Sequence, residues 1–175
     1  MRLIIINGPS GVGKSTIAER ISHALPLSLL LDIDAQRRFI SGYRELRKES
    51  YDLVFNFCLA AVDAHLRAGH DVIIEKIIRN DDSKLTELER IGQQHGAQVY
   101  ELILNARKET VLHRAHERGF QEGGSLTPEK AAQFWEEVRS LIPRRSNAHV
   151  IDTDQQTPED TWNHVAKIVG LQLMF

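Results

Sequence analysis

A short apolar run near the amino terminus leads directly into a glycine-rich turn. Residues 3–6 read Leu-Ile-Ile-Ile, and residues 8–15 read Gly-Pro-Ser-Gly-Val-Gly-Lys-Ser. Because the apolar run is short, mostly β-branched and bounded by Asn7, it predicts a strand that is buried on both faces. A helix is expected from about Lys14 until Pro26 ends it. A buried strand, a tight loop and a helix in this order favour an α/β architecture.

The spacing of residues 8–15 matches the full pattern G-x-x-x-x-G-K-[ST]. In such a loop, backbone N–H groups point inward and donate hydrogen bonds to phosphate oxygens, and glycines permit the close approach. Lys14 is expected to reach the β- and γ-phosphates, and the Ser15 hydroxyl to coordinate Mg²⁺. The alternative is a glycine-rich turn that binds nothing, but this alternative does not explain why Lys14 and Ser15 follow the last glycine. The residues expected to contact the nucleotide here are Gly8, Ser10, Gly11, Val12, Gly13, Lys14, Ser15 and Thr16.

These residues resemble the Walker A motif of P-loop nucleoside triphosphatases and kinases. The resemblance implies that the chain binds ATP together with Mg²⁺, and that Lys14 is a catalytic residue. It also implies that residues after the other strands of the sheet should complete a site around this loop.

The composition fits one globular domain that has no polymeric polyanion as a partner. The chain has 175 residues, of which 42% are hydrophobic and 26% charged, so we expect residues 1–175 to form a single domain. The net charge is −2, which leaves no basic excess for a nucleic acid polymer or a membrane surface. Cys58 is the only cysteine, and no apolar run has the length of a signal peptide or a membrane span. These features favour a cytoplasmic protein.

Further apolar runs alternate with helical patterns along the chain. Strands are expected at residues 27–34, 71–75, 99–104 and 148–154. Helices are expected at residues 49–68, 83–95, from about 108, 129–141 and from about 157. Five strands that alternate with helices predict a three-layer α/β/α fold with a mostly parallel sheet. In the helix at residues 49–68, the expected inner face includes Leu53 and Phe57.

Acidic residues stand at the carboxyl ends of two predicted strands. Asp32 and Asp34 end the second strand, and Glu75 ends the third. The ligand crevice of a parallel α/β sheet lies beyond these ends, so the carboxylates should lie near the glycine-rich loop. Asp34 is our choice for the base that takes the proton of an acceptor hydroxyl, and Asp32 and Glu75 are expected to serve Mg²⁺. The alternatives are helix capping for either aspartate, and plain exposure to solvent for Glu75.

Three arginines follow these acids and are expected to bind the acceptor. Arg37 and Arg38 come directly after the second strand, where an exposed helix face is the alternative. The spacing from Glu75 to Arg79 resembles the acid-to-Arg spacing of nucleoside monophosphate kinases. That resemblance implies that the acid serves the metal and that Arg79 binds the acceptor's phosphate.

A second pair of arginines lies one helical turn apart. The spacing of Leu112, Arg114 and Arg118 resembles the start of the mobile lid in adenylate-kinase-like and shikimate-kinase-like enzymes. This implies that Arg114 packs on the adenine and that Arg118 stabilises the transferred phosphoryl group. A small helical lid is expected over about residues 119–145, and its closure would exclude water. Within it, Arg144 and Arg145 are expected either to supply a further cation or to face solvent.

The turn after the last strand resembles the base-binding loop of the same kinases, which implies that Asp154 and Gln155, with Thr153, rim the purine. Together these features resemble the small P-loop kinase group, which includes nucleoside monophosphate, shikimate and gluconate kinases, chloramphenicol phosphotransferases and zeta toxins. The resemblance implies transfer of the γ-phosphoryl group of ATP to a hydroxyl or phosphate of a small-molecule acceptor. A nucleotide-dependent switch or accessory NTPase with a protein partner is the alternative, although the sequence lacks the Asn-Lys-x-Asp motif of GTPases.

Overall fold

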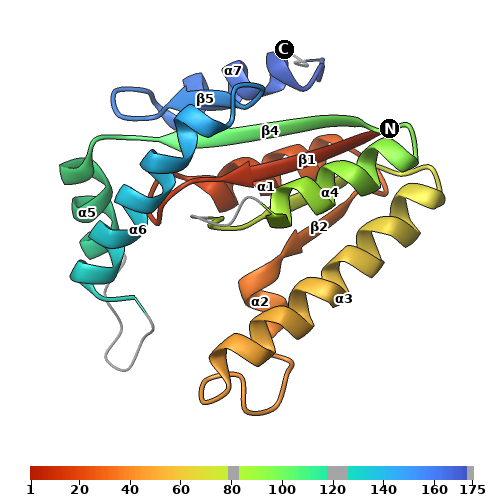
Figure 1. The fold of residues 1–175 in the computed structure, drawn as a ribbon. Helices are drawn as coiled ribbons and strands as arrows, with labels where there is room; N and C mark the ends of the chain where they lie inside the picture. The colour runs from red at the N-terminus through yellow and green to blue at the C-terminus, as the bar shows by residue number, and fades with distance from the viewer. Residues whose placement is uncertain (79–82, 118–125, 173–175) are drawn as a thin grey trace.

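The computed structural model describes residues 1–78, 83–117 and 126–172. Within these ranges the chain forms strands and helices in alternation (Figure 1). The strands are β1 (Arg2–Asn7), β2 (Leu29–Asp32), β3 (Val72–Glu75), β4 (Gln98–Asn105) and β5 (His149–Asp152). The helices are α1 (Lys14–Ala24), α2 (Ile33–Arg37), α3 (Arg47–Arg67), α4 (Ser83–Gln94), α5 (Lys108–Glu117), α6 (Pro128–Leu141), the 3₁₀ turn η1 (Ile142–Arg144) and α7 (Pro158–Ile168). None of the described helices is long and apolar enough to cross a membrane.

The strands form one parallel sheet in the order β2-β3-β1-β4-β5. The central strand β1 pairs with β3 on one side and with β4 on the other, so that Ile5 lies opposite both Ile74 and Glu101. Because the strands are parallel, their carboxyl ends meet at one edge of the sheet. The loop after β1 and the acidic ends of β2 and β3 therefore lie at the same edge. The predicted three-layer α/β/α fold with a five-stranded parallel sheet is confirmed.

Side chains of β1 alternate between two apolar cores. Leu3 and Ile5 pack in the core that α3 and α4 cover, and Ile4 and Ile6 pack in the core that α1 and α7 cover. All four side chains are fully buried. Burial on both faces explains why this strand is continuously apolar instead of alternating between apolar and polar residues.

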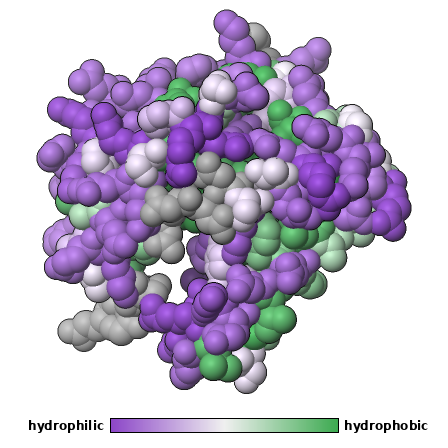
Figure 2. All heavy atoms as spheres, viewed as in Figure 1, coloured by the Kyte–Doolittle hydropathy of each residue, from purple (hydrophilic) through white to green (hydrophobic). Residues whose placement is uncertain are grey.

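The inner face of α3 differs from the prediction. Leu53 and Phe57 are 60% and 58% exposed, and Val54 and Cys58 are buried in their place. The helix carries two apolar rows, and the row with Val54 and Cys58 faces the sheet. Figure 2 shows hydrophobic side chains along the side of the molecule where α3 runs. Burial raises the pKa of the Cys58 thiol to about 11, so the thiol stays protonated and unreactive at neutral pH.

The second strand ends two residues earlier than predicted, at Asp32. The Asp32 carboxylate accepts hydrogen bonds from the backbone N–H groups of Asp34 and Ala35 at 2.9 and 3.1 Å and thereby caps α2. Helix capping, the alternative considered for Asp32, is therefore what the structure shows. Asp34 lies in the first turn of α2, so the prediction that the second strand extends to Asp34 is wrong.

Two other helices begin within one residue of the positions expected from the sequence. Thr127 accepts a hydrogen bond from the backbone of Lys130 and caps α6, which begins at Pro128. Thr157 and Asp160 form a reciprocal capping box at the start of α7. Of the lid expected over residues 119–145, the structure describes residues from 126 onward, where α6 packs against α5 (Figure 1).

Arg145 follows η1 and forms a buried ion network. Its guanidinium donates to Glu101 of β4 at 2.9 Å and pairs with Glu89 of α4. The Arg145 side chain is 12% exposed and that of Glu101 is 5% exposed. Arg145 therefore fulfils neither role considered for it, because it ties the end of α6 to the sheet and to α4.

We predict that Arg145→Ala destabilises the protein by about 3–5 kcal/mol, because it leaves the buried Glu101 carboxylate without this cation. Urea unfolding followed by circular dichroism measures the change. Arg38→Ala is the matched control, because the Arg38 side chain is exposed, and it should change the unfolding free energy by less than about 0.5 kcal/mol. Equal stabilities of the two variants would contradict the assigned role of the network.

Candidate nucleotide and acceptor site

The glycine-rich loop joins β1 to α1 at the carboxyl edge of the sheet. Gly8 has φ 147°, and a Cβ there would lie 2.4 Å from the carbonyl oxygen of Leu104 in β4. Gly13 has φ 92° and precedes α1, but a Cβ there would have no neighbour within 4 Å. The loop is therefore pressed against β4 at its start and open at its end. The open end leaves the helix N-terminus accessible to an anion.

Asn7 fastens the start of this loop, a role that the sequence analysis missed. The side chain is fully buried, and its Oδ1 accepts hydrogen bonds from the backbone N–H groups of Gly8 and Ile78 at 2.8 and 2.9 Å. Its Nδ2 donates to the Ile78 carbonyl oxygen at 2.9 Å. The amide thus joins the loop to the segment after β3. A polar residue at the end of a buried apolar strand was the available signal, because such a side chain needs partners.

Lys14 and Ser15 each make a polar contact at the glycine-rich loop. Lys14 is buried, and its Nζ donates to the Pro9 carbonyl oxygen at 3.0 Å across the loop. The Ser15 hydroxyl donates to the Glu75 carboxylate at 2.8 Å. Burial raises the pKa of Glu75, and the nearby Asp32 carboxylate acts in the same direction, while Ser15 and Lys14 oppose the shift.

A cavity of about 250 Å³ lies on this side of the loop. It brings together five residues that the sequence assigned to metal binding or catalysis. They are Lys14, Ser15, Asp32, Asp34 and Glu75. The cavity is also lined by Ser10, Gly11, Gly13, Lys76, Ile77, Ala115 and Leu126.

The expected acceptor arginines are placed differently. Arg37 donates to the Tyr43 carbonyl oxygen at 2.9 Å and its guanidinium lies 5.5 Å from the Tyr43 ring centre. Arg38 is exposed, and neither arginine lines the cavity. Arg79 and Arg118 lie outside the described residues.

Lys76 is a cavity residue that the sequence analysis did not assign. The side chain is 7% exposed, and its Nζ lies 2.5 Å from the Asp34 carboxylate. The ammonium also lies 4.6 Å from the centre of the Tyr51 ring. Burial lowers the pKa of Lys76, while the attraction of Asp34 opposes this shift.

The residues around this cavity fit a bound Mg²⁺ ion. Ser15 supplies a hydroxyl oxygen and Glu75 a carboxylate oxygen to the cavity beside the glycine-rich loop. The described residues contain no group of three or more His, Cys, Asp or Glu side chains arranged to hold a metal by themselves. Mg²⁺ keeps several water ligands and commonly takes one or two protein oxygens plus substrate phosphates, so the donor set suits it.

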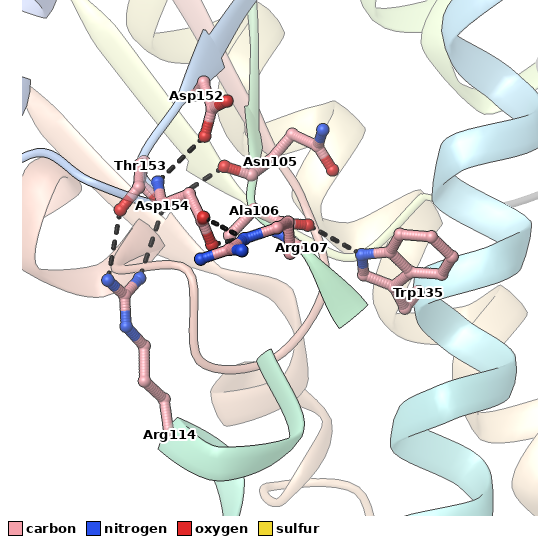
Figure 3. A network of polar contacts seen from close by, with 8 residues as sticks. All are labelled: Asn105, Ala106, Arg107, Arg114, Trp135, Asp152, Thr153 and Asp154. Carbon is pink, nitrogen blue, oxygen red and sulfur yellow. Dashed lines mark hydrogen bonds and ion pairs between the residues drawn. The ribbon is translucent and has the colours of Figure 1, made fainter. Parts of the chain in front are cut away.

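A second cavity, of about 230 Å³, lies on the other side of the loop. Arg114 of α5 lines it and donates to the carbonyl oxygen of Thr153 at 3.1 Å (Figure 3). Thr153 also accepts from Arg114 through its hydroxyl at 3.4 Å. Gly11 and Gly13 line both cavities, so the loop forms a wall of each space. The other lining residues are Val12, Thr16, Ile17, Gln156, Pro158 and Thr161.

The turn after β5 presents one of the three expected residues, Thr153, to the second cavity. Thr153 and Gln156 line the second cavity, whereas Asp154 and Gln155 do not. The Asp154 carboxylate accepts from the Arg107 backbone at 3.1 Å and pairs with the Arg107 guanidinium (Figure 3). The hydrogen bond from the Thr110 side chain lowers the pKa of Asp154 most, and the hydrogen bonds from Arg107 lower it further.

The glycine-rich loop, its lysine and serine, and the parallel sheet define a P-loop nucleotide-binding protein. The sequence model of the AAA domain matches residues 3–142, and the chain belongs to this family. Among curated proteins, none matches the sequence significantly.

Several solved structures share the whole fold. The tunicamycin resistance protein of Deinococcus radiodurans has a TM-score of 0.68 and 19% identity, over 100% of this chain and 99% of that chain. A sugar kinase from a Janibacter species has a TM-score of 0.70 and 20% identity, over 98% and 95%. A gluconokinase from Sinorhizobium meliloti has a TM-score of 0.65 and 19% identity, over 97% and 94%. At these identities the similarity establishes the fold.

We predict that Gly8→Ala destabilises the protein by at least about 2 kcal/mol more than Gly13→Ala, because Gly8 combines strain with a backbone clash whereas Gly13 has strain alone. Gly13→Ala should cost about 1–2 kcal/mol, the strain of a left-handed residue. Urea unfolding midpoints of the two variants provide the comparison. A Gly13→Ala variant as unstable as Gly8→Ala would contradict the description of an open loop end.

Proposed function

We propose that the protein is an ATP- and Mg²⁺-dependent phosphotransferase that moves the γ-phosphoryl group of ATP to a hydroxyl or phosphate of a small-molecule acceptor. The observation that carries the proposal is that two cavities flank the glycine-rich loop, with Gly11 and Gly13 lining both. The cavity beside Arg114 suits a nucleoside, and the cavity beside Asp34 suits an acceptor. A triphosphate along the loop would connect them. The kinase names of two similar structures support this assignment.

Each residue of the loop region has a role in this proposal. Lys14 exchanges its contact with Pro9 for the β- and γ-phosphates, and loop N–H groups bind the same oxygens. Ser15, Glu75 and Asp32 would hold Mg²⁺, which would neutralise phosphate charge when bound. Because Asp32 also caps α2, its carboxylate is fixed at the cavity wall.

Asp34 is the proposed base. With a hydroxyl acceptor, the O–H proton passes to the Asp34 carboxylate as the acceptor oxygen bonds to the γ-phosphorus. The bond between the γ-phosphorus and the bridging oxygen breaks, and that oxygen leaves with ADP. The exposure of Asp34, at 54% of its side chain, leaves room for an acceptor to reach it.

Other expected roles remain proposals from the family resemblance. Arg118 would stabilise the transferred phosphoryl group, and Arg79 would bind the acceptor, with Arg37 and Arg38 nearby. Residues 1–175 would form a single cytoplasmic domain in which about residues 119–145 close as a lid. Asp154 and Gln155 would bind the nucleotide base only after the Arg107 contact to Asp154 opens.

Acceptor-dependent ADP formation distinguishes this proposal from the alternative of a nucleotide-dependent switch. A coupled assay would measure ADP release from ATP and Mg²⁺ with D-gluconate, D-glucose, deoxyadenosine, AMP and shikimate, each compared with no acceptor. Stimulation by any of these compounds supports the phosphotransferase. If none of these compounds changes the rate of ADP release and only the protein fraction of a cell extract raises it, the result would support the switch instead.

We predict that Lys14→Ala lowers kcat/KM for ATP by at least about 100-fold, because one phosphate-binding cation is lost from the transition state. The coupled ADP assay measures the loss. Lys167→Ala removes an exposed lysine of α7 and should leave the value unchanged. Unchanged turnover in the Lys14→Ala variant would refute the role of the loop.

We predict that Arg114→Ala weakens ATP binding by about 2- to 30-fold, the range of a lost cation–π contact with the base. Calorimetric titration with ATP and Mg²⁺ provides the dissociation constants. Arg67→Ala serves as the control, because Arg67 is an exposed arginine of α3 that lines neither cavity. Equal affinities of the two variants for ATP would show that the nucleotide base does not contact Arg114.

A further inference from the structure

We propose that Lys76 is a positioning residue that holds the Asp34 carboxylate toward the acceptor. The inference rests on the proposed function, because it takes Asp34 as the group that accepts the acceptor's proton. It adds a residue to the site that no motif of the sequence indicates.

The two partners of this ion pair differ in how firmly they are held. Lys76 follows β3, and its backbone N–H donates to the Ile6 carbonyl oxygen at 3.1 Å, so its main chain is fixed to the central strand. Its side chain is 7% exposed, whereas that of Asp34 is 54% exposed. Asp34 lies in the first turn of the short helix α2. A fixed ammonium therefore restrains an otherwise exposed carboxylate, at an Nζ–Oδ1 distance of 2.5 Å.

An aromatic ring restrains the Lys76 ammonium from another direction. The Tyr51 ring of α3 lies 4.6 Å from Nζ of Lys76, and Nζ of Lys84 lies 3.7 Å from the same ring. Lys84 also pairs with Asp52 at 3.4 Å, and it does not line the acceptor cavity. Tyr51 thus contacts one lysine that reaches Asp34 and another that does not. This difference supplies a matched control for an experiment.

The burial of Lys76 couples it to Asp34 energetically. Because Lys76 is buried, the loss of Asp34 alone would leave its ammonium without this compensating carboxylate, which costs more than the loss of both partners. Among the described residues, Asp34 is the carboxylate to which Lys76 donates a hydrogen bond. If Lys76 acts on the reaction only through Asp34, its substitution should have no further effect once Asp34 is gone.

The step that Lys76 supports is the orientation of the base. Misplacement of a reacting group by about 1 Å can lower a rate about 100-fold. Without the ammonium, the Asp34 carboxylate is free to rotate toward solvent. We therefore expect the loss to fall on kcat with the acceptor saturating, and not on ATP binding, because the contacts that the structure gives Lys14 and Arg114 involve neither Lys76 nor Asp34.

The test compares Lys76→Met, Asp34→Asn, the double variant and Lys84→Met in the coupled ADP assay, with the acceptor of the panel above that stimulates wild type most. Lys76→Met should lower kcat about 100-fold and leave the calorimetric dissociation constant for ATP within about 2-fold of wild type. The double variant should be no slower than Asp34→Asn alone. Lys84→Met should keep wild-type kcat. Lys76→Gln gives the same comparison if urea unfolding shows that Lys76→Met does not fold.

Two results would overturn the inference while the proposed function stands. One is wild-type kcat in Lys76→Met together with a slow Asp34→Asn variant. The other is a double variant whose loss equals the product of the two single losses. If wild type transfers phosphate to none of the acceptors, the proposed function fails for them. A crystal structure of Lys76→Met then decides the inference: a displaced Asp34 carboxylate supports it, and an unmoved one refutes it.

Discussion

The site depends on the attachment of the glycine-rich loop to the carboxyl edge of the sheet. Asn7 makes this attachment by joining the backbone of Gly8 to that of Ile78 across neighbouring strands. Because a Cβ at Gly8 would lie 2.4 Å from the Leu104 carbonyl oxygen, β4 restrains the loop from the other side. The position of α1, and of the two cavities on either side of the loop, follows from this restraint. A side chain at Gly8 or an apolar residue at position 7 would disturb both cavities together.

Charge balance organises the acceptor side of the loop. Asp32, Asp34 and Glu75 bring three carboxylates to one cavity, and Lys14 and Lys76 bring two ammonium groups. Lys14 and Lys76 are buried, and burial makes their charges costly unless a partner compensates them. In the structure these partners come from the same cavity: Lys76 pairs with Asp34, and Glu75 accepts a hydrogen bond from Ser15. A bound triphosphate and cation would rearrange these pairs without adding a new protein charge.

Much of this arrangement could be predicted from the sequence. The buried strand and the glycine loop were readable because β-branched runs and Gly-Lys-Ser spacing each have one dominant physical explanation. The buried face of α3 was not, because periodicity cannot tell which of two apolar rows meets the sheet, and Leu53 and Phe57 proved exposed. Partners distant in sequence were also hidden. No local pattern shows that Lys76 meets Asp34, or that Arg145 meets Glu101.

The central claim is that the loop binds a nucleoside triphosphate, and calorimetric titration of the wild-type protein tests it most directly. With Mg²⁺ present, we expect saturable binding of ATP at one site per chain. AMP should bind much more weakly, because it lacks the phosphates that Lys14 and the loop N–H groups would contact. No detectable heat with ATP, GTP or any other nucleoside triphosphate would contradict the account. Equal affinity for ATP and AMP would contradict it as well.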